Sequence, residues 1–151
     1  MTTEKTTNAL SKIVEWQKER QLLRGAENVD LKNEVSFIVE ELIEMISPHK
    51  SETARERAKE VVHKWKEEGL FSEKNDPENI VDAACDIIVF ATGLIAKMGY
   101  EPNIAMDETL KEISSRTGEI IDGKFVKCKT EECKKKWYKA DYSKAKKEGY
   151  W

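Results

Sequence analysis

The chain has 151 residues, of which 39% are hydrophobic and 36% are charged, and its formal net charge is −3. This length favours one domain with a buried core, and the slightly acidic balance gives no reason to expect a stable nucleic-acid partner. The first eight residues are polar and lack the apolar segment of a signal peptide. The three cysteines argue against a disulfide framework, so we expect a cytoplasmic protein in a reducing compartment.

The first predicted helix runs from Ala9 to Leu23 and ends at Gly25. A short link, 28–32, leads to a helix over 34–46. At about 100° per residue, one arc of that helix is apolar; it carries Val35, Ile38, Val39, Leu42, Met45 and Ile46. The carboxylates of Glu34, Glu41 and Glu44 border this arc, with Glu40 further round. They therefore flank the apolar stripe instead of facing away from it.

Start and stop signals divide the middle of the chain. Pro48 stops the second helix, and Ser51 is a good N-cap for a third helix that ends near Gly69. Asp76-Pro77-Glu78 combines a cap, a proline at the first position and an acid near the positive end of the helix dipole. It predicts a fourth helix that runs to about Met98.

The last third of the chain is less regular. Pro102 opens a shorter helix to about Ser115, with Ile104, Met106, Leu110 and Ile113 facing inward. The stretch 120–126 predicts a small hairpin around an Asp-Gly turn. The remaining residues, 128–151, are basic and aromatic, and we expect an irregular tail that wraps the core.

The stretch Ile80–Met98 approaches the length of a membrane span, but Asp82, Asp86 and Lys97 interrupt it. We therefore expect a core helix, with Cys85 buried, and no membrane contact. Aspartate is unfavourable inside a helix, and two of them stand one turn apart here. Because unpaired buried charges are very costly, these aspartates need either a divalent cation or a buried Lys or Arg partner.

The acidic motifs resemble those of the all-α nucleoside triphosphate pyrophosphohydrolases, the MazG-like superfamily, and are most similar to its phage-type members. The first motif stands here as Glu40-Glu41-Leu42-Ile43-Glu44, and a similar acidic pair follows in Asp82-Ala83-Ala84-Cys85-Asp86. The family usually has glutamate where this chain has Ala83, and Asp82 stands one position earlier. The upstream stretch from Trp16 to Gly25 is also similar, so the resemblance covers about residues 9 to 126.

This resemblance implies an all-α bundle of four to five helices, in one domain with its core over about 9–118 and a hairpin and tail over 119–151. It implies Mg²⁺-dependent hydrolysis, with Mn²⁺ as an alternative, of a (deoxy)nucleoside triphosphate to the monophosphate and pyrophosphate. The implied metal ligands are Glu41, Glu44, Asp82 and Asp86. Glu40 or Glu41 would orient or deprotonate the attacking water.

Three further residues are candidates for substrate contacts. Trp16 could stack on a base, and Lys111 and Arg116 could hold phosphates. Each also has a structural interpretation, as a core aromatic or as ordinary surface cations.

Several alternatives for function stay open at this point. Within the enzyme class, the substrate could be phosphoribosyl-ATP or dUTP. From a different class, the chain could be a non-catalytic helical interaction module whose acidic groove binds a basic partner. In either case we expect a homodimer or homotetramer, because short helices leave part of the apolar stripe of 80–98 exposed. The location would be the host cytoplasm if this is a phage protein.

Overall fold

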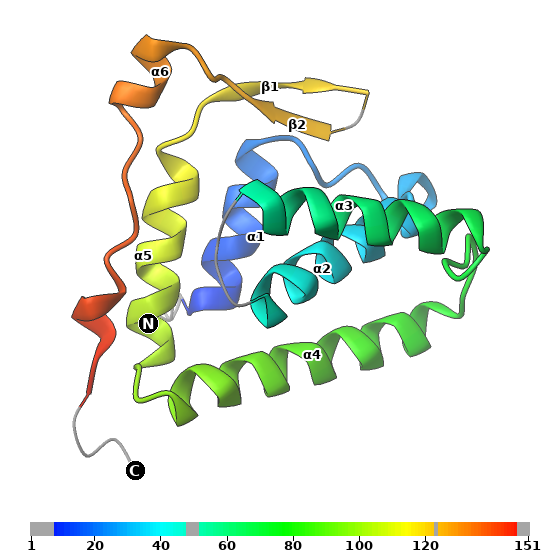
Figure 1. Cartoon of the computed structure of the whole chain (residues 1–151), viewed down its shortest axis with the longest axis horizontal. Coiled ribbons are helices and arrows are strands. Elements are labelled where there is room, and N and C mark those ends of the chain that lie inside the picture. The colour runs from blue at the N-terminus through cyan, green and yellow to red at the C-terminus, as the bar shows by residue number, and fades with distance from the viewer. Residues whose placement is uncertain (1–7, 48–51, 123, 148–151) are drawn as a thin grey trace, which may run out of the picture. The chain divides into compact units, whose positions relative to one another are not determined.

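The computed structural model describes residues 8–47, 52–122 and 124–147 (Figure 1). This part of the chain is mostly helical and has one small two-stranded sheet, so the helical class expected from the sequence is confirmed. By its internal contacts the chain divides into two compact units, Arg24–Ala83 and Met1–Leu23 with Ala84–Trp151. The boundary between them falls inside α4 (Pro77–Lys97).

The unit Arg24–Ala83 is built on two helices that lie side by side, α2 (Leu31–Ile46) and α3 (Glu52–Glu67), preceded by the short η1 (Ala26–Asn28) (Figure 1). The Asp30 side chain caps α2 by accepting from the Asn33 N–H, at 3.2 Å. Gly69 follows α3 with a positive φ of 74°, as its predicted stop requires. The predicted stop at Pro48 and cap at Ser51 lie outside the described residues.

The core of this unit differs from the predicted apolar arc of α2. Its buried cluster consists of Ile43, Ala58, Val62 and Phe71, with Val35, Val39 and Val61 packed against it. The other side of the predicted arc is exposed; it carries Ile38, Leu42, Met45 and Ile46. The reason is that α3 covers a narrower side of α2 than the apolar stripe occupies. The arc is therefore only in part a core face.

The helix α4 begins where the sequence predicts. The Glu78 N–H donates to Asp76 Oδ1 at 3.0 Å, and Gly99, with φ +85°, follows the helix end. Within the described ranges α4 is the one helix long and apolar enough to cross a membrane, judged by length and composition alone. None of its residues is buried, and Phe90 is 78% exposed. The prediction of a core helix is therefore wrong.

Two consequences follow from the exposure of α4. The prediction that Cys85 is buried is also wrong, because this thiol is exposed. Asp82 and Asp86 are exposed as well, so they carry no desolvation cost that a partner would have to offset. The apolar composition of α4 therefore does not mean that this helix is packed inside the core.

The other unit contains α1 (Ala9–Glu19), α5 (Pro102–Ser114), β1 (Gly118–Ile121), β2 (Lys124–Lys127), α6 (Glu131–Lys135) and η2 (Tyr142–Ala145). The helix α1 ends before the predicted Leu23 because Gln21 adopts a left-handed φ of 55°. The Gln21 and Leu22 N–H groups then close the helix end by donating to the carbonyls of Lys18 and Gln17. The predicted hairpin is confirmed, with Ile120 opposite Phe125.

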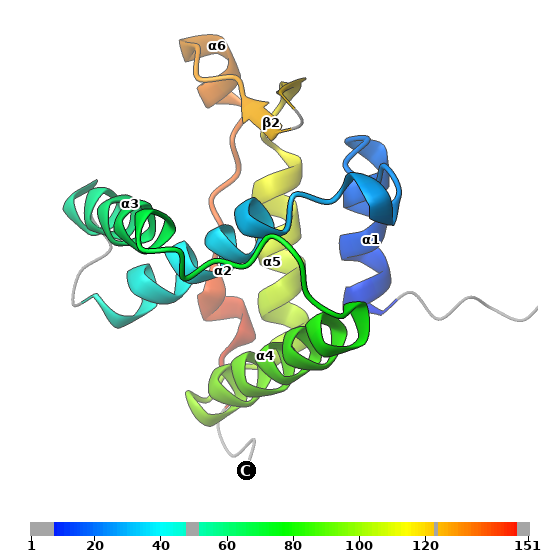
Figure 2. The ribbon, with the colours of Figure 1, turned by 90° about the vertical axis from the view of Figure 1, so that its right-hand side faces the viewer.

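The C-terminal strap, which we define as residues 137–147, runs along α5 in the opposite direction. Figure 2 shows α6 at one end of α5 and η2 at the other. The Tyr138 N–H donates to Ser115 Oγ at 2.8 Å, and the Glu101 N–H donates to the Ala145 carbonyl at 2.7 Å. Ala145 is fully buried. The irregular tail expected from the sequence thus packs along this helix.

A disulfide joins Cys128 and Cys133, whose Cα atoms lie 6.0 Å apart. Our expectation from the cysteine count, that the chain has no disulfide framework, does not hold at this pair. A count of cysteines does not show how the chain folds between them. Thr130 caps α6, with the Cys133 N–H donating to its hydroxyl at 3.3 Å, and this cap turns the chain back toward the end of β2. The cellular location stays a prediction.

Candidate functional site

A cavity of about 510 Å³ lies between α1 and α5, inside one unit. Each helix contributes one face, with positions i, i+3, i+4 and i+7. From α1 these are Lys12, Glu15, Trp16 and Glu19, and from α5 they are Asp107, Leu110, Lys111 and Ser114. Two of the three residues that we selected for substrate contacts, Trp16 and Lys111, therefore share one cavity. The same spacing around Trp16 could have identified its three neighbours on α1.

The indole of Trp16 is held in place from behind. The Arg20 guanidinium lies over it at 4.4 Å, and the Phe125 ring meets it edge-on with centroids 6.3 Å apart. Arg20 in turn reaches the Ile113 carbonyl at 3.4 Å. Burial lowers the pKa of Arg20, and nearby Glu19 opposes this effect. Trp16 is thus a fixed wall of the cavity as well as part of the packing.

Both lysines of the cavity have carboxylate partners. Lys12 Nζ lies 2.9 Å from Asp107 Oδ1, and Lys111 Nζ lies 2.9 Å from Glu108 Oε2. The Lys12–Asp107 pair is about half exposed, and such pairs contribute roughly 0–1 kcal/mol. Asp107 therefore holds the Lys12 ammonium only weakly.

Arg116, the third residue that we selected, does not line this cavity. Its guanidinium lies 5.4 Å from the Trp137 ring centroid and 3.6 Å from Glu112 Oε2. A cation–π contact of this kind stabilises the start of the strap. The structure therefore gives Arg116 a packing role.

Glu108 is a buried carboxylate that the sequence did not point to; it is 1% exposed. Its two oxygens have different partners. Oε2 accepts from Lys111, whereas Oε1 accepts from the Tyr138 hydroxyl and, at 3.0 Å, from the Asp141 N–H. Lys144 Nζ lies 3.6 Å from Oε1. One side chain thus connects a lysine of the cavity with the strap.

These donors, the Tyr138 hydroxyl first and then Lys111 and the Asp141 N–H, lower the pKa of Glu108 from 4.5 to about 2. A lowered pKa means that Glu108 stabilises the folded state above pH 4.5 and that this contribution is lost as the pH falls toward 2. We expect the melting temperature, followed by circular dichroism, to fall across this window. In Glu108→Gln this component should be missing; identical profiles for the two proteins would contradict the assignment.

The carboxylates of the two acidic motifs lie on α2 and α4. Glu40 and Glu44 are partly exposed, and Glu41, Asp82 and Asp86 are exposed. Within the described ranges neither aspartate forms an ion pair or a hydrogen bond, so the alternative of a buried Lys or Arg partner finds no support.

The structure places the two aspartates one turn apart on one helix. Across residues 8–47, 52–122 and 124–147 no three His, Cys, Asp or Glu side chains are grouped closely enough to hold a metal ion. Among the described residues, Glu41, Glu44, Asp82 and Asp86 therefore do not form such a group.

No family model, no curated protein and no solved structure matches the chain. The MazG-like resemblance rests on the motifs and their spacing.

Proposed function

We propose that this chain is a magnesium-dependent nucleotide pyrophosphohydrolase, which converts a (deoxy)nucleoside triphosphate to the monophosphate and pyrophosphate. The observation that carries the proposal is the cavity between α1 and α5. It brings together an indole for the base, at Trp16, and two ammonium groups for phosphates, at Lys12 and Lys111. Its volume of about 510 Å³ suits a small-molecule ligand. Phosphoribosyl-ATP and dUTP are the alternative substrates.

In this proposal Mg²⁺, or Mn²⁺ in its place, is held by Glu41, Glu44, Asp82 and Asp86. The donor chemistry fits, because hard cations prefer carboxylate oxygens, and both aspartates are exposed and without a partner in the described part of the chain. The metal would neutralise the triphosphate and polarise its phosphorus. Glu40 or Glu41 would orient or deprotonate the attacking water.

The test is pyrophosphate release from each nucleoside triphosphate, dUTP and phosphoribosyl-ATP, with millimolar Mg²⁺ and with excess chelator. We expect turnover with the metal and none with the chelator. Because the metal binds the folded state, Mg²⁺ at 100 times its dissociation constant should also stabilise the fold by about 2.7 kcal/mol. Turnover in excess chelator would rule out the metal mechanism, and no pyrophosphate from any substrate would rule out the function.

The exposed apolar face of α4 favours a second candidate, a helical interaction module without catalysis. Ile87, Phe90 and Leu94, spaced at i, i+3 and i+7, are all exposed on the helix that carries Asp82 and Asp86. Such a face suits an amphipathic helix with basic side chains. A chain that releases no pyrophosphate but binds a basic amphipathic peptide, with affinity that falls as salt is added, would favour this function.

The same exposed face leads us to expect a homodimer or homotetramer. Phe90→Glu should shift the assembly toward monomer in sedimentation velocity, because a charge then replaces a 78% exposed aromatic ring. Asn79→Glu is the matched control, since it adds the same charge at an exposed polar position of α4. A wild-type protein that sediments as a monomer at micromolar concentration would contradict this prediction.

A further inference from the structure

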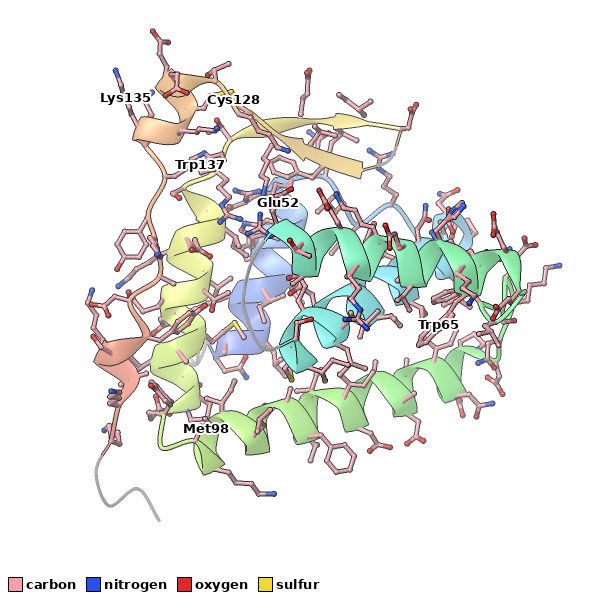
Figure 3. The ribbon with its side chains drawn as sticks, in the orientation of Figure 1. Glu52, Trp65, Met98, Cys128, Lys135 and Trp137 are labelled. Atoms are coloured by element: carbon pink, nitrogen blue, oxygen red, sulfur yellow. A yellow bond between two sulfur atoms is a disulfide. The ribbon has the colours of Figure 1, made fainter. Side chains whose placement is uncertain are left out.

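The start of the C-terminal strap is tied to the hairpin by the Cys128–Cys133 disulfide. Cys128 directly follows β2, and its N–H donates to the Thr117 carbonyl at 2.7 Å. The Thr117 hydroxyl lies 3.8 Å from the Cys133 sulfur, which belongs to α6. The bond therefore fixes α6 beside the junction of α5 and β1. Figure 3 shows the Cys128 side chain next to α6, with Trp137 beyond it.

The helix α6 has five residues, too few to be stable without such a constraint. The first contacts of the strap follow it directly. Trp137 lies over the Arg116 guanidinium, and the Tyr138 N–H binds Ser115 Oγ. Tyr138 then reaches the buried Glu108. The position of the strap on α5 thus depends on a helix that the disulfide holds.

The surroundings of this disulfide favour its reduction. Both cysteines are partly exposed. The sequence around them holds two acidic residues, Glu131 and Glu132, and five lysines; the lysines are Lys127, Lys129, Lys134, Lys135 and Lys136. A net positive environment stabilises thiolates, and accessible disulfides are the more readily reduced class.

We propose that the Cys128–Cys133 disulfide is a redox switch that controls how firmly the strap binds α5. A small dithiol is the reductant. One of its thiolates attacks a cystine sulfur and breaks the S–S bond, and its second thiol then displaces the mixed disulfide. The protein gains two electrons and two protons as two thiols, and the reductant leaves as a disulfide. The released strap uncovers Glu108, and this switch does not depend on the proposed enzymatic function.

The test uses the full-length chain with Cys85→Ser, so that the remaining thiols report this pair. Limited trypsin cleavage after Lys139 and Lys144, followed by mass spectrometry, should become faster by on the order of tenfold in dithiothreitol. Cys128→Ser with Cys133→Ser should show the fast rate with and without dithiothreitol. Cleavage after Lys66 of α3 is the internal control and should not change.

Three results would overturn the proposal. The first is two free thiols after reduction with unchanged cleavage of the strap. The second is a disulfide that stays closed in the folded protein in excess dithiothreitol. The third is a double serine variant that is cleaved in the strap as slowly as the oxidised protein.

Discussion

Glu108→Gln is expected to detach the strap from α5 and to lower the melting temperature by on the order of 5 °C. The glutamine keeps the shape of the side chain, but it removes the charge that Lys111 and Lys144 face. In glutamine one of the two oxygens is replaced by an amide nitrogen, which cannot accept a hydrogen bond. The donors that now bind that oxygen therefore lose their acceptor. Because the side chain is buried, water cannot replace these lost hydrogen bonds.

The matched control is Asp107→Asn, the neighbouring residue on α5. It removes the same charge from a half-exposed ion pair with Lys12, so its melting temperature should change little. Trypsin cleavage after Lys139 should rise in Glu108→Gln alone. Equal melting temperatures for the two variants would show that Glu108 does not anchor the strap.

Asp86→Asn is expected to reduce Mg²⁺-dependent turnover by roughly 100-fold or more while the fold stays intact. Loss of one metal contact commonly costs several kcal/mol of transition-state stabilisation, and each ~1.36 kcal/mol is tenfold in rate. Since Asp86 is exposed and has no partner among the described residues, the free energy of unfolding should change by less than about 0.5 kcal/mol. Without metal, the change should be toward higher stability, because repulsion with Asp82 is removed.

The control for this variant is Glu78→Gln, two turns earlier on α4, which removes a carboxylate that we do not place at the metal. Turnover and metal-free stability are measured on the same preparation. A folded Asp86→Asn protein with full activity would exclude Asp86 as a metal ligand. A loss of roughly 3–5 kcal/mol in stability would instead indicate a buried cationic partner.

The helix boundaries were largely predictable because their signals are local. Asp76-Pro77-Glu78 starts α4 and Pro102 starts α5, as the chemistry of capping and of the fixed proline φ requires. The end of α1 was not predictable, since Gln21 takes a left-handed conformation that usually indicates glycine. Local signals therefore predicted where these helices begin and end, except at the C-terminal end of α1.

Burial was less predictable, because periodicity tells which side chains share a face but not what covers that face. The stripe of α2 is wider than the surface of α3 that packs on it, and α4 has no buried residue at all. The sequence also could not show the Cys128–Cys133 bond, which depends on how α6 turns back toward β2.

Part of the lining of the candidate cavity could be predicted from the sequence. Trp16 and Lys111 came from the sequence, and helical spacing adds their neighbours on α1 and α5. Glu108 could not be identified in this way. Its partners Tyr138 and Asp141 follow 30 and 33 residues later, in an irregular stretch that carries no periodic signal.

One oxygen of Glu108 binds Lys111 and the other binds the strap, and this arrangement limits which changes of sequence the protein can accept. Oε1 is provided with donors by residues that lie at the far end of the sequence. If those residues were lost, the carboxylate would lose both these donors and the strap that covers it, and water would take their place. A descendant that shortens its tail therefore no longer needs a carboxylate at position 108. The strap and Glu108 are therefore expected to be kept or lost together as the sequence changes.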